Sequence, residues 1–293
     1  MLANLKFFLF NKENQTFTSR KLLLFAVMFL SVYHFAQTNR FLYELVIQKS
    51  DETVHAVMAL DIDGKAVKFY DYEFVQQDSL RKATGKNLQF FSPTEQMLTR
   101  TLNSNTNQSY LPFQYGYYSV KTDDKINWKL SPETKKVENY TLQKAVADFG
   151  GRSWTAWFTT EIPFQEGPYK FRGLSGLIFE VYDSENIFHY TLMKSQKLPK
   201  TYDTSDFLET RYGKPAMPIT LQQYHKLKLD YYNNIVQTLS DFKEKGGSIA
   251  SGNGERELNS KEDILAERKA IQKSIKKYYL PVEKDRAIPY PAD

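Results

Sequence analysis

Three glutamates, Glu161, Glu166 and Glu180, lie within one short stretch of this sequence. Paired carboxylates are common in general acid–base chemistry, in which one group donates a proton and another accepts one. An enzyme that uses Glu161 and Glu180 is therefore one hypothesis. The competing interpretation is that these acids are exposed at strand ends, where Arg152, beside a Gly-Gly turn, would pair with one of them.

The sequence offers few residues for metal or nucleophilic chemistry. It has no cysteine, which excludes disulfides, thiolate metal sites and cysteine nucleophiles. His55, His189 and His225 follow the first 36 residues, and no two of them have the spacing of zinc ligands. The sequence DIDG at 61–64 resembles part of a calcium loop, but it lacks the third acidic position and the distal glutamate, so a hairpin is favoured. We predict no metal site and no cofactor.

In the stretch GPYKFRGLSGLIFEVYD, residues 167–183, Gly173 and Gly176 bracket a leucine and a serine, a spacing that resembles a catalytic or phosphate-binding loop. A phosphate loop needs a helix after its glycines, and a nucleophile elbow needs a serine at a strand-to-helix turn. Here Gly176 is followed by an alternating apolar run that is typical of a strand. Ser175 directly precedes that glycine and does not fit the elbow. Both catalytic interpretations are therefore disfavoured.

A structural corner explains the stretch better. Pro168 fixes its own backbone φ and lacks an amide donor, while glycines permit positive φ or close backbone approach. We expect the corner to place Leu177, Phe179 and Val181 on the core face and Glu180 on the other. The residues assigned to this structural signature are Gly167, Pro168, Gly173, Leu174, Gly176 and Leu177.

The same loop is also a candidate binding surface, because loops held by rigid strands often carry function. Its residues 169–172 (Tyr-Lys-Phe-Arg) would form a lip, and aromatic side chains nearby would line an apolar groove. Ordinary sheet packing of these aromatic residues is the alternative. The aromatic set is Tyr140, Trp154, Trp157, Phe158, Tyr169 and Phe171, and the residues chosen as the binding site are Arg152, Trp157, Tyr169, Phe171 and Arg172.

The N-terminus has the pattern of an export signal. Arg20 and Lys21 precede the apolar run 22–33, and Ala36 offers a cleavage point. Twelve residues of helix rise about 18 Å, which is short of a hydrocarbon core of about 30 Å. A signal peptide at 1–36 is therefore preferred over a membrane anchor, and the mature chain is expected to be periplasmic or secreted. Its removal lowers the net charge from +5 to +2, which gives no support for a nucleic-acid partner.

Short alternating segments predict an antiparallel sheet for most of the remaining chain. Residues 39–48 alternate, 57–71 contain a hairpin signal at Asp63-Gly64, and 138–159 contain another at Gly150-Gly151. In the arm 152–159, Trp154, Ala156 and Phe158 share one face. A short helix is expected at 74–82.

The C-terminal part is expected to be helical. Thr220 and Gln223 form a capping-box pattern, and apolar residues at spacings of three and four predict one helix that ends near Gly246. Ser260 begins a second helix, with acidic residues early and lysines late. The fold prediction is therefore α+β: a large curved antiparallel sheet with two C-terminal helices. The predicted divisions are 1–36, 37–215 and 216–293, the last being a helical region packed on the sheet.

The residues 167–183 also resemble the signature of the GLPGLI family of exported Bacteroidota proteins. The segments FAQTNRFLYE, WKL, ETKKVENYTLQKA and FGGRSWTAWFTTEIP are similar to the family too, and the tail YYLPVEKD resembles its Asn-Pro-Ile-Glu-Leu ending. Ser175 stands where the family has proline, and Leu142 where many members have cysteine. The family has no known function, so the resemblance implies export and architecture but no catalytic residues.

Two functional hypotheses follow. The first is a binding module that holds an apolar ligand or a cell-envelope partner in a groove beside the 167–176 loop. The aromatic content of 15% and the absence of a nucleophile, metal or cofactor motif favour it. The second is a periplasmic enzyme that uses Glu161 and Glu180, and whether the protein is an enzyme stays open from the sequence.

Overall fold

The computed structural model describes residues 37–86, 92–211, 213–250, 257–258 and 260–291. The predicted signal peptide at 1–36 lies outside these residues. In the described ranges no helix is long and apolar enough to cross a membrane.

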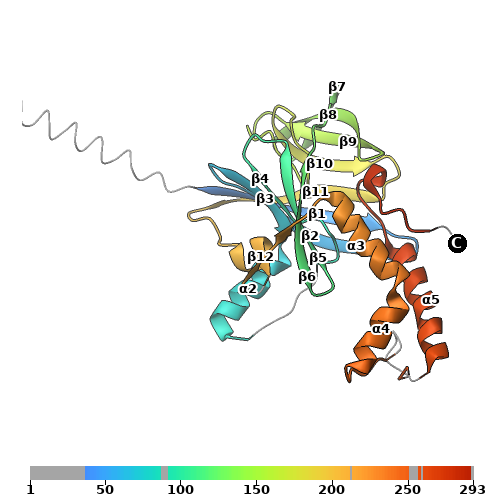
Figure 1. Ribbon diagram of the computed structural model, residues 1–293. Coiled ribbons are helices and arrows are strands. Elements are labelled where there is room, and N and C mark those ends of the chain that lie inside the picture. Colours follow the sequence, from blue (N-terminus) through green and yellow to red (C-terminus); the bar gives the residue numbers. More distant parts are fainter. Residues whose placement is uncertain (1–36, 87–91, 212, 251–256, 259, 292–293) are drawn as a thin grey trace, which may run out of the picture.

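A twelve-stranded curved sheet forms the body of the protein (Figure 1), so the α+β class is confirmed. The strand order is β14-β6-β5-β4-β3-β2-β1-β11-β10-β9-β8-β7, and all pairs are antiparallel except β14 with β6. The strands are β1 (Thr38–Gln48), β2 (Thr53–Ile62), β3 (Ala66–Asp71), β4 (Leu98–Thr101), β5 (Thr106–Phe113), β6 (Gly116–Asp123), β7 (Lys129–Val137), β8 (Tyr140–Phe149), β9 (Arg152–Thr159), β10 (Leu177–Asp183), β11 (Phe188–Leu198) and β14 (Met217–Pro218); β12 (Thr210–Arg211) pairs with β13 (Lys214–Pro215).

Both predicted hairpins are confirmed. Strands β2 and β3 are joined at Asp63-Gly64, where the Asp63 carboxylate accepts hydrogen bonds from the amides of Lys65 (2.7 Å) and Ala66 (2.6 Å). Strands β8 and β9 are joined by Gly150 and Gly151, whose φ angles are +64° and +71°. Two successive positive φ angles match the twist of a hairpin, and glycine adopts them without strain.

The main core lies on one face of β1, β2 and β8–β11. Alternation along β9 places Trp154, Ala156 and Phe158 in this core, as the sequence predicts, and all three are at most 1% exposed. Burial of such large aromatic side chains stabilises each by about 1.5–3 kcal/mol relative to exposure.

Strand β10 exists as predicted, but its side chains do not alternate regularly. A bulge between Ile178 and Glu180 breaks the alternation, so Ile178 lies opposite Phe158 and Val181 lies opposite Ala156. An extra residue in a bulge shifts the side chains that follow to the other face. Leu177, Phe179 and Val181 nevertheless all belong to the main core and Glu180 does not, as predicted.

The other face of the sheet has a second cluster, formed around Leu42, Ala59, Tyr70 and Leu208. It is covered by α2 (Glu73–Thr84), which confirms the predicted short helix, and by the π-helical turn η1 (Ser205–Glu209). Strands β1, β2 and β3 thus contribute buried residues on both faces of the sheet.

Three helices follow the sheet among the described residues: α3 (Leu221–Asn233), α4 (Ile235–Glu244) and α5 (Lys261–Tyr278). The single helix predicted up to Gly246 is wrong, because Asn234 (φ −110°, ψ 24°) interrupts it. Asparagine has a low helix propensity, and here the non-helical backbone turns the chain between α3 and α4. The capping boxes at Thr220 and Ser260 are both present.

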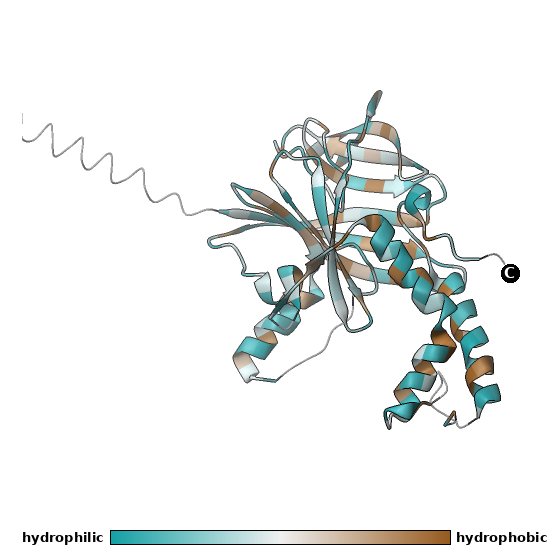
Figure 2. Cartoon of the chain, viewed as in Figure 1, coloured by the Kyte–Doolittle hydropathy of each residue, from teal (hydrophilic) through white to brown (hydrophobic). Residues whose placement is uncertain are grey.

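Helix α3 packs through Tyr224 on Leu111 of β5 and Val120 of β6. Helices α4 and α5 contact each other and extend away from the sheet (Figure 1), with hydrophilic residues over most of their surface (Figure 2). After α5 the chain returns to the sheet. We call residues 279–290 the tail; it includes the 3₁₀ turn η2 (Lys284–Arg286).

Candidate functional site

The loop at 161–176, the signature loop, is a hydrogen-bonded corner between β9 and β10. A Cβ on Gly176 would lie 1.8 Å from the carbonyl oxygen of Thr159, so only glycine fits this close approach. Gly173 has a φ of +94°, and its amide donates to Gln165 at 3.0 Å. Tyr169 also adopts a positive φ of +51°, which is uncommon for a residue with a side chain.

The predicted binding aromatics separate to two sides of the sheet. Phe171 is completely buried and packs on Trp154, with 4.4 Å between ring centroids. Trp157 points to the other side, where the Lys135 ammonium lies 4.5 Å from its ring centroid. These residues therefore do not line a common groove: Phe171 belongs to the core, and Trp157 to a partly exposed outer face.

The signature loop holds the tail through Tyr169 and Lys170. The Tyr169 hydroxyl donates to Glu283 at 2.7 Å, and the Lys170 ammonium lies 2.7 Å from the same carboxylate and 3.0 Å from Asp124. Arg286 lies 2.5 Å from Asp124 and 2.7 Å from Glu283. Because these groups are largely buried, removal of one partner leaves an uncompensated charge, which is costly.

Arg152 also binds the tail. Its guanidinium donates to two successive carbonyl oxygens, of Pro281 at 3.1 Å and of Val282 at 3.0 Å. The expected pairing with Glu161, Glu166 or Glu180 is wrong, because the carboxylates that Arg152 contacts are Asp183 at 2.9 Å and Glu185 at 3.3 Å. Asp183 is the last residue of β10, and Glu185 lies two residues beyond it.

Arg172 anchors the loop from within. Its Nε donates to Glu166 at 3.4 Å, and its backbone carbonyl accepts a hydrogen bond from the Trp128 indole at 2.9 Å. Glu166 also forms a buried ion pair with Arg100, which donates to the Tyr169 carbonyl at 3.1 Å. The charges of Arg172 and Glu166 are thus used to hold the loop in place.

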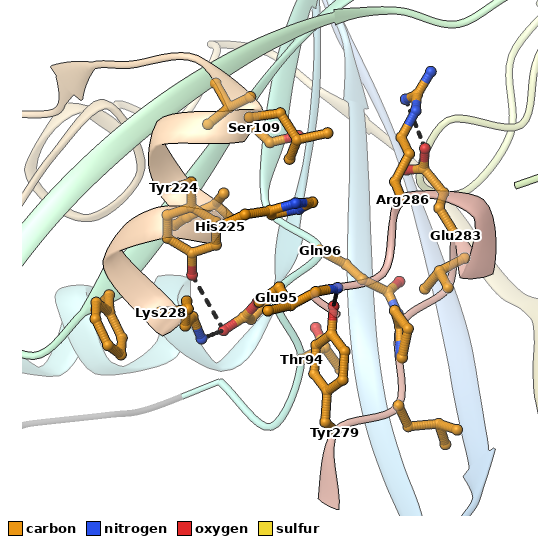
Figure 3. A pocket seen from close by; sticks show the side chains of 18 of the residues that line it. Thr94, Glu95, Gln96, Ser109, Tyr224, His225, Lys228, Tyr279, Glu283 and Arg286 are labelled. Carbon is orange, nitrogen blue, oxygen red and sulfur yellow. Dashed lines mark hydrogen bonds and ion pairs between the residues drawn. The ribbon is translucent and has the colours of Figure 1, made fainter. Parts of the chain in front are cut away.

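A cleft of about 520 Å³ lies between the sheet, α3 and the tail (Figure 3). Apolar and aromatic side chains form much of its wall. They come from β5 and β6 (Leu111, Phe113, Val120), from α3 (Leu221, Tyr224, Tyr231) and from the tail (Tyr279, Val282, Ile288, Tyr290). Tyr169 and Lys170 of the signature loop also line it, so the cleft adjoins the loop that the sequence singled out.

Polar groups occur at a few places in this wall. Glu95 accepts from Lys228 at 2.7 Å and from the Tyr224 hydroxyl at 3.4 Å, as drawn in Figure 3. The Tyr279 hydroxyl accepts from the Ile288 amide at 2.7 Å and thereby folds the tail on itself. A mainly apolar wall with a few fixed polar groups is typical of small-molecule sites.

Burial determines the protonation states of the histidine and tyrosine side chains that line the cleft. It lowers the pKa of His225, so this imidazole is neutral at pH 7, and it raises the pKa of Tyr290 to about 12. Tyr224 and Tyr279 also have pKa values above the ordinary value, again mainly because of burial. The tyrosines are therefore uncharged hydrogen-bonding groups near neutral pH.

The two carboxylates of the enzyme hypothesis contact separate partners. Glu161 is exposed and accepts from the Thr141 amide at 3.0 Å. Glu180 lies on the outer face, where it contacts Lys135 and the imidazole of His189, the latter at 2.8 Å. His189 first, and then Lys135, lower the pKa of Glu180, so the carboxylate is ionised at pH 7. Among the described residues, no group of three or more His, Asp or Glu is placed to bind a metal ion.

The residues that line the cleft were not identified from the sequence. Tyr224 belonged only to an apolar helix face in the sequence analysis, and Glu95, Lys228 and Tyr290 had no distinguishing pattern. The similarity of YLPVEKD to a family ending marked the tail, but gave no indication that it contacts the signature loop.

A family model described as "Protein of unknown function (Porph_ging)" matches residues 151–180, which include the whole signature loop. No curated protein matches the chain. Two solved structures of PNGF-II, in space groups C2 and P21, are similar at 14% identity, with TM-scores of 0.47 and 0.48, over 65% and 66% of this chain. The chain spans about a third of the length of those proteins, 32% and 33%.

Proposed function

We propose that this protein is an exported cell-envelope protein, periplasmic or secreted, that binds an apolar ligand in the cleft between the sheet, α3 and the tail. The observation that carries the proposal is the cleft itself. Its volume of about 520 Å³ lies within the range of about 300–1,000 Å³ that is usual for small-molecule sites.

The tyrosines determine what the cleft can accept. Tyr224, Tyr279 and Tyr290 combine large apolar rings with neutral hydroxyl groups, so they suit a ligand that is apolar over most of its surface. Lys49 and Lys228 also line the cleft, but each is paired with a carboxylate, of Glu52 and of Glu95 respectively. The ligand class is therefore an apolar or aromatic molecule.

The carboxylate enzyme has less support, since Glu161 and Glu180 bind different partners and neither lines the cleft. An apolar ligand therefore remains the better account of the 167–176 region. A cell-envelope protein that inserts an apolar group into the cleft would use the same contacts as a free apolar ligand.

A fluorescence titration tests the proposal with anilinonaphthalene sulfonate, an aromatic anion that fluoresces in apolar sites. Ser109 of β5 lines the cleft, so Ser109→Phe places a ring inside it. The control is Thr106→Phe, an exposed position of the same strand whose side chain, by alternation, points to the other face. We expect saturable binding to the wild type and to the control, and at least about tenfold weaker binding to Ser109→Phe. Equal binding by all three proteins would reject the cleft as the site.

A further inference from the structure

The contacts between the tail and the signature loop have the pattern of peptide recognition. Arg152 donates to two successive backbone carbonyls of the segment 281–286, and the Gly150 carbonyl accepts from the Lys284 amide at 2.6 Å. Backbone hydrogen bonds of this kind supply affinity in peptide complexes, and pockets for alternate side chains supply specificity.

Two side chains of the segment enter such pockets. Val282 is 8% exposed and joins the main core beneath the signature loop. The next residue, Glu283, is also buried, and its carboxylate meets the Tyr169 hydroxyl and the Lys170 ammonium. The Tyr169 hydroxyl and the Lys170 ammonium form a pocket that suits a carboxylate. A neutral or basic side chain at this position would leave the buried lysine unpaired, so the pocket discriminates strongly against it.

The glycines of the β8–β9 turn make room for the segment. A Cβ on Gly150 would lie 2.9 Å from the Glu283 Cα, and one on Gly151 would lie 3.1 Å from the Asp285 amide nitrogen. The Gly-Gly pair therefore serves both the hairpin turn and the close approach of the segment. The positive φ values alone do not account for this contact.

We propose that the Gly150-Gly151 turn and the signature loop form a peptide-binding slot for a Pro-Val-Glu-Lys-Asp-Arg segment, occupied in this protein by its own residues 281–286. In the slot, Arg152 donates hydrogen bonds to the backbone of the segment, and Tyr169 and Lys170 bind its glutamate. Because Val282, Glu283 and Arg286 also line the cleft, the docked segment is one wall of the ligand site. This last point rests on the proposed function, whereas the slot itself does not.

The slot is tested in the full chain with the double substitution Val282→Asp and Glu283→Lys, which puts a carboxylate in the core and a cation beside Lys170. We expect the segment to leave the slot. A fluorescently labelled peptide of residues 279–290 should then bind to the variant, as measured by anisotropy. The wild-type chain is the matched control, because its slot is occupied, and it should bind little or none. A peptide carrying Glu283→Lys should bind neither protein.

A second variant tests the slot independently, in case the double variant does not fold. Arg152→Lys keeps a positive charge beside Asp183 but lacks the planar guanidinium whose three nitrogens donate to Pro281, Val282 and Asp183 at once. We expect the Lys284 amide to exchange its hydrogen about tenfold faster in this variant, measured by mass spectrometry without any ligand. Arg81→Lys on α2, which is remote from the tail in the fold, should leave that exchange rate unchanged. Unchanged exchange in Arg152→Lys, or a peptide that binds wild type and the double variant equally, would overturn the slot.

The two proposals fail separately. If anilinonaphthalene sulfonate binds none of the proteins while the exchange and peptide results hold, the slot stands and the ligand cleft is rejected. If the dye binds the wild type, the segment is expected to form part of its site. Binding to Arg152→Lys should then be several-fold weaker, and equal dye affinity would overturn the coupling of the segment to the cleft.

Discussion

Phe171 shows what a residue type in a sequence can and cannot predict. Its aromatic character and its place in the signature loop made a binding role plausible. In the structure it is 0% exposed and contacts Trp154, Phe149 and Tyr190. Whether a loop aromatic points inward depends on contacts with distant strands, and these are not visible in local sequence.

Substitution of Phe171 should therefore affect folding before it affects any ligand. We expect Phe171→Ala to lower the free energy of unfolding by about 3–5 kcal/mol, because it leaves a cavity in the core. Trp157→Ala, on the partly exposed outer face, should cost markedly less. Urea denaturation followed by circular dichroism measures both. Equal losses for the two variants would contradict the placement of Phe171.

Asp124 makes stability depend on acidity. Burial alone would raise the pKa of Asp124, but Lys170, Thr122 and Arg286 together lower it below the ordinary value. A lowered folded-state pKa stabilises the fold above the unfolded-state value of about 3.9, and this contribution disappears as the pH falls through the folded-state pKa.

The Asp124→Asn substitution tests that contribution. We expect the variant to be less stable than wild type at pH 7 and to lose less additional stability between about pH 5 and pH 2, because its amide does not titrate. Urea midpoints measured across this range give the two slopes. Parallel pH profiles for wild type and variant would show that Asp124 contributes nothing to the acid sensitivity.

At the level of elements, local chemistry predicted the turns and caps well. Asp63-Gly64, Gly150-Gly151, Thr220 and Ser260 each begin or join the element expected, since each acts on its own backbone neighbours. The bulge in β10 and the break at Asn234 were missed. The bulge arises where β10 pairs with β9, which no local pattern indicates, and the break occurs at a residue of low helix propensity inside a regular apolar period.

The two sheet edges differ from the interior strands in composition. Edge strand β7 contains Pro132 and Lys136, is exposed along most of its length, and has a register shift between Leu130 and Thr134. The other edge, β14, has only two residues, one of them proline. Prolines, lysines, bulges and short edge strands are known means of preventing edge-to-edge association.

Removal of these features from β7 should cause self-association. We expect Pro132→Val with Lys136→Val to sediment as dimers and larger species at concentrations where the wild type is unchanged, because the freed edge can pair with a second copy. Thr191→Val is the control, because Thr191 is exposed but lies in β11 between β1 and β10, with a paired residue on each side. A double variant that sediments like this control would show that β7 needs no such protection.

At the scale of the whole molecule, the sequence indicated the α+β architecture and singled out the stretch 167–183. It did not indicate the cleft, because the cleft depends on contacts of long sequence separation. Lys170 meets Glu283, and Tyr224 meets Glu95, across more than 100 residues in each case. The direction in which α5 returns the tail to the sheet decides these contacts, and no local pattern encodes it.

The central claim is that the cleft between the sheet, α3 and the tail holds an apolar ligand. Native mass spectrometry of the protein purified from cells that produce it naturally, followed by denaturing extraction, tests this most directly. We predict that wild type and Thr106→Phe carry the same small apolar molecule, and that Ser109→Phe carries at most about a tenth as much. A wild-type protein without bound molecule, or equal amounts in Ser109→Phe, would contradict the claim.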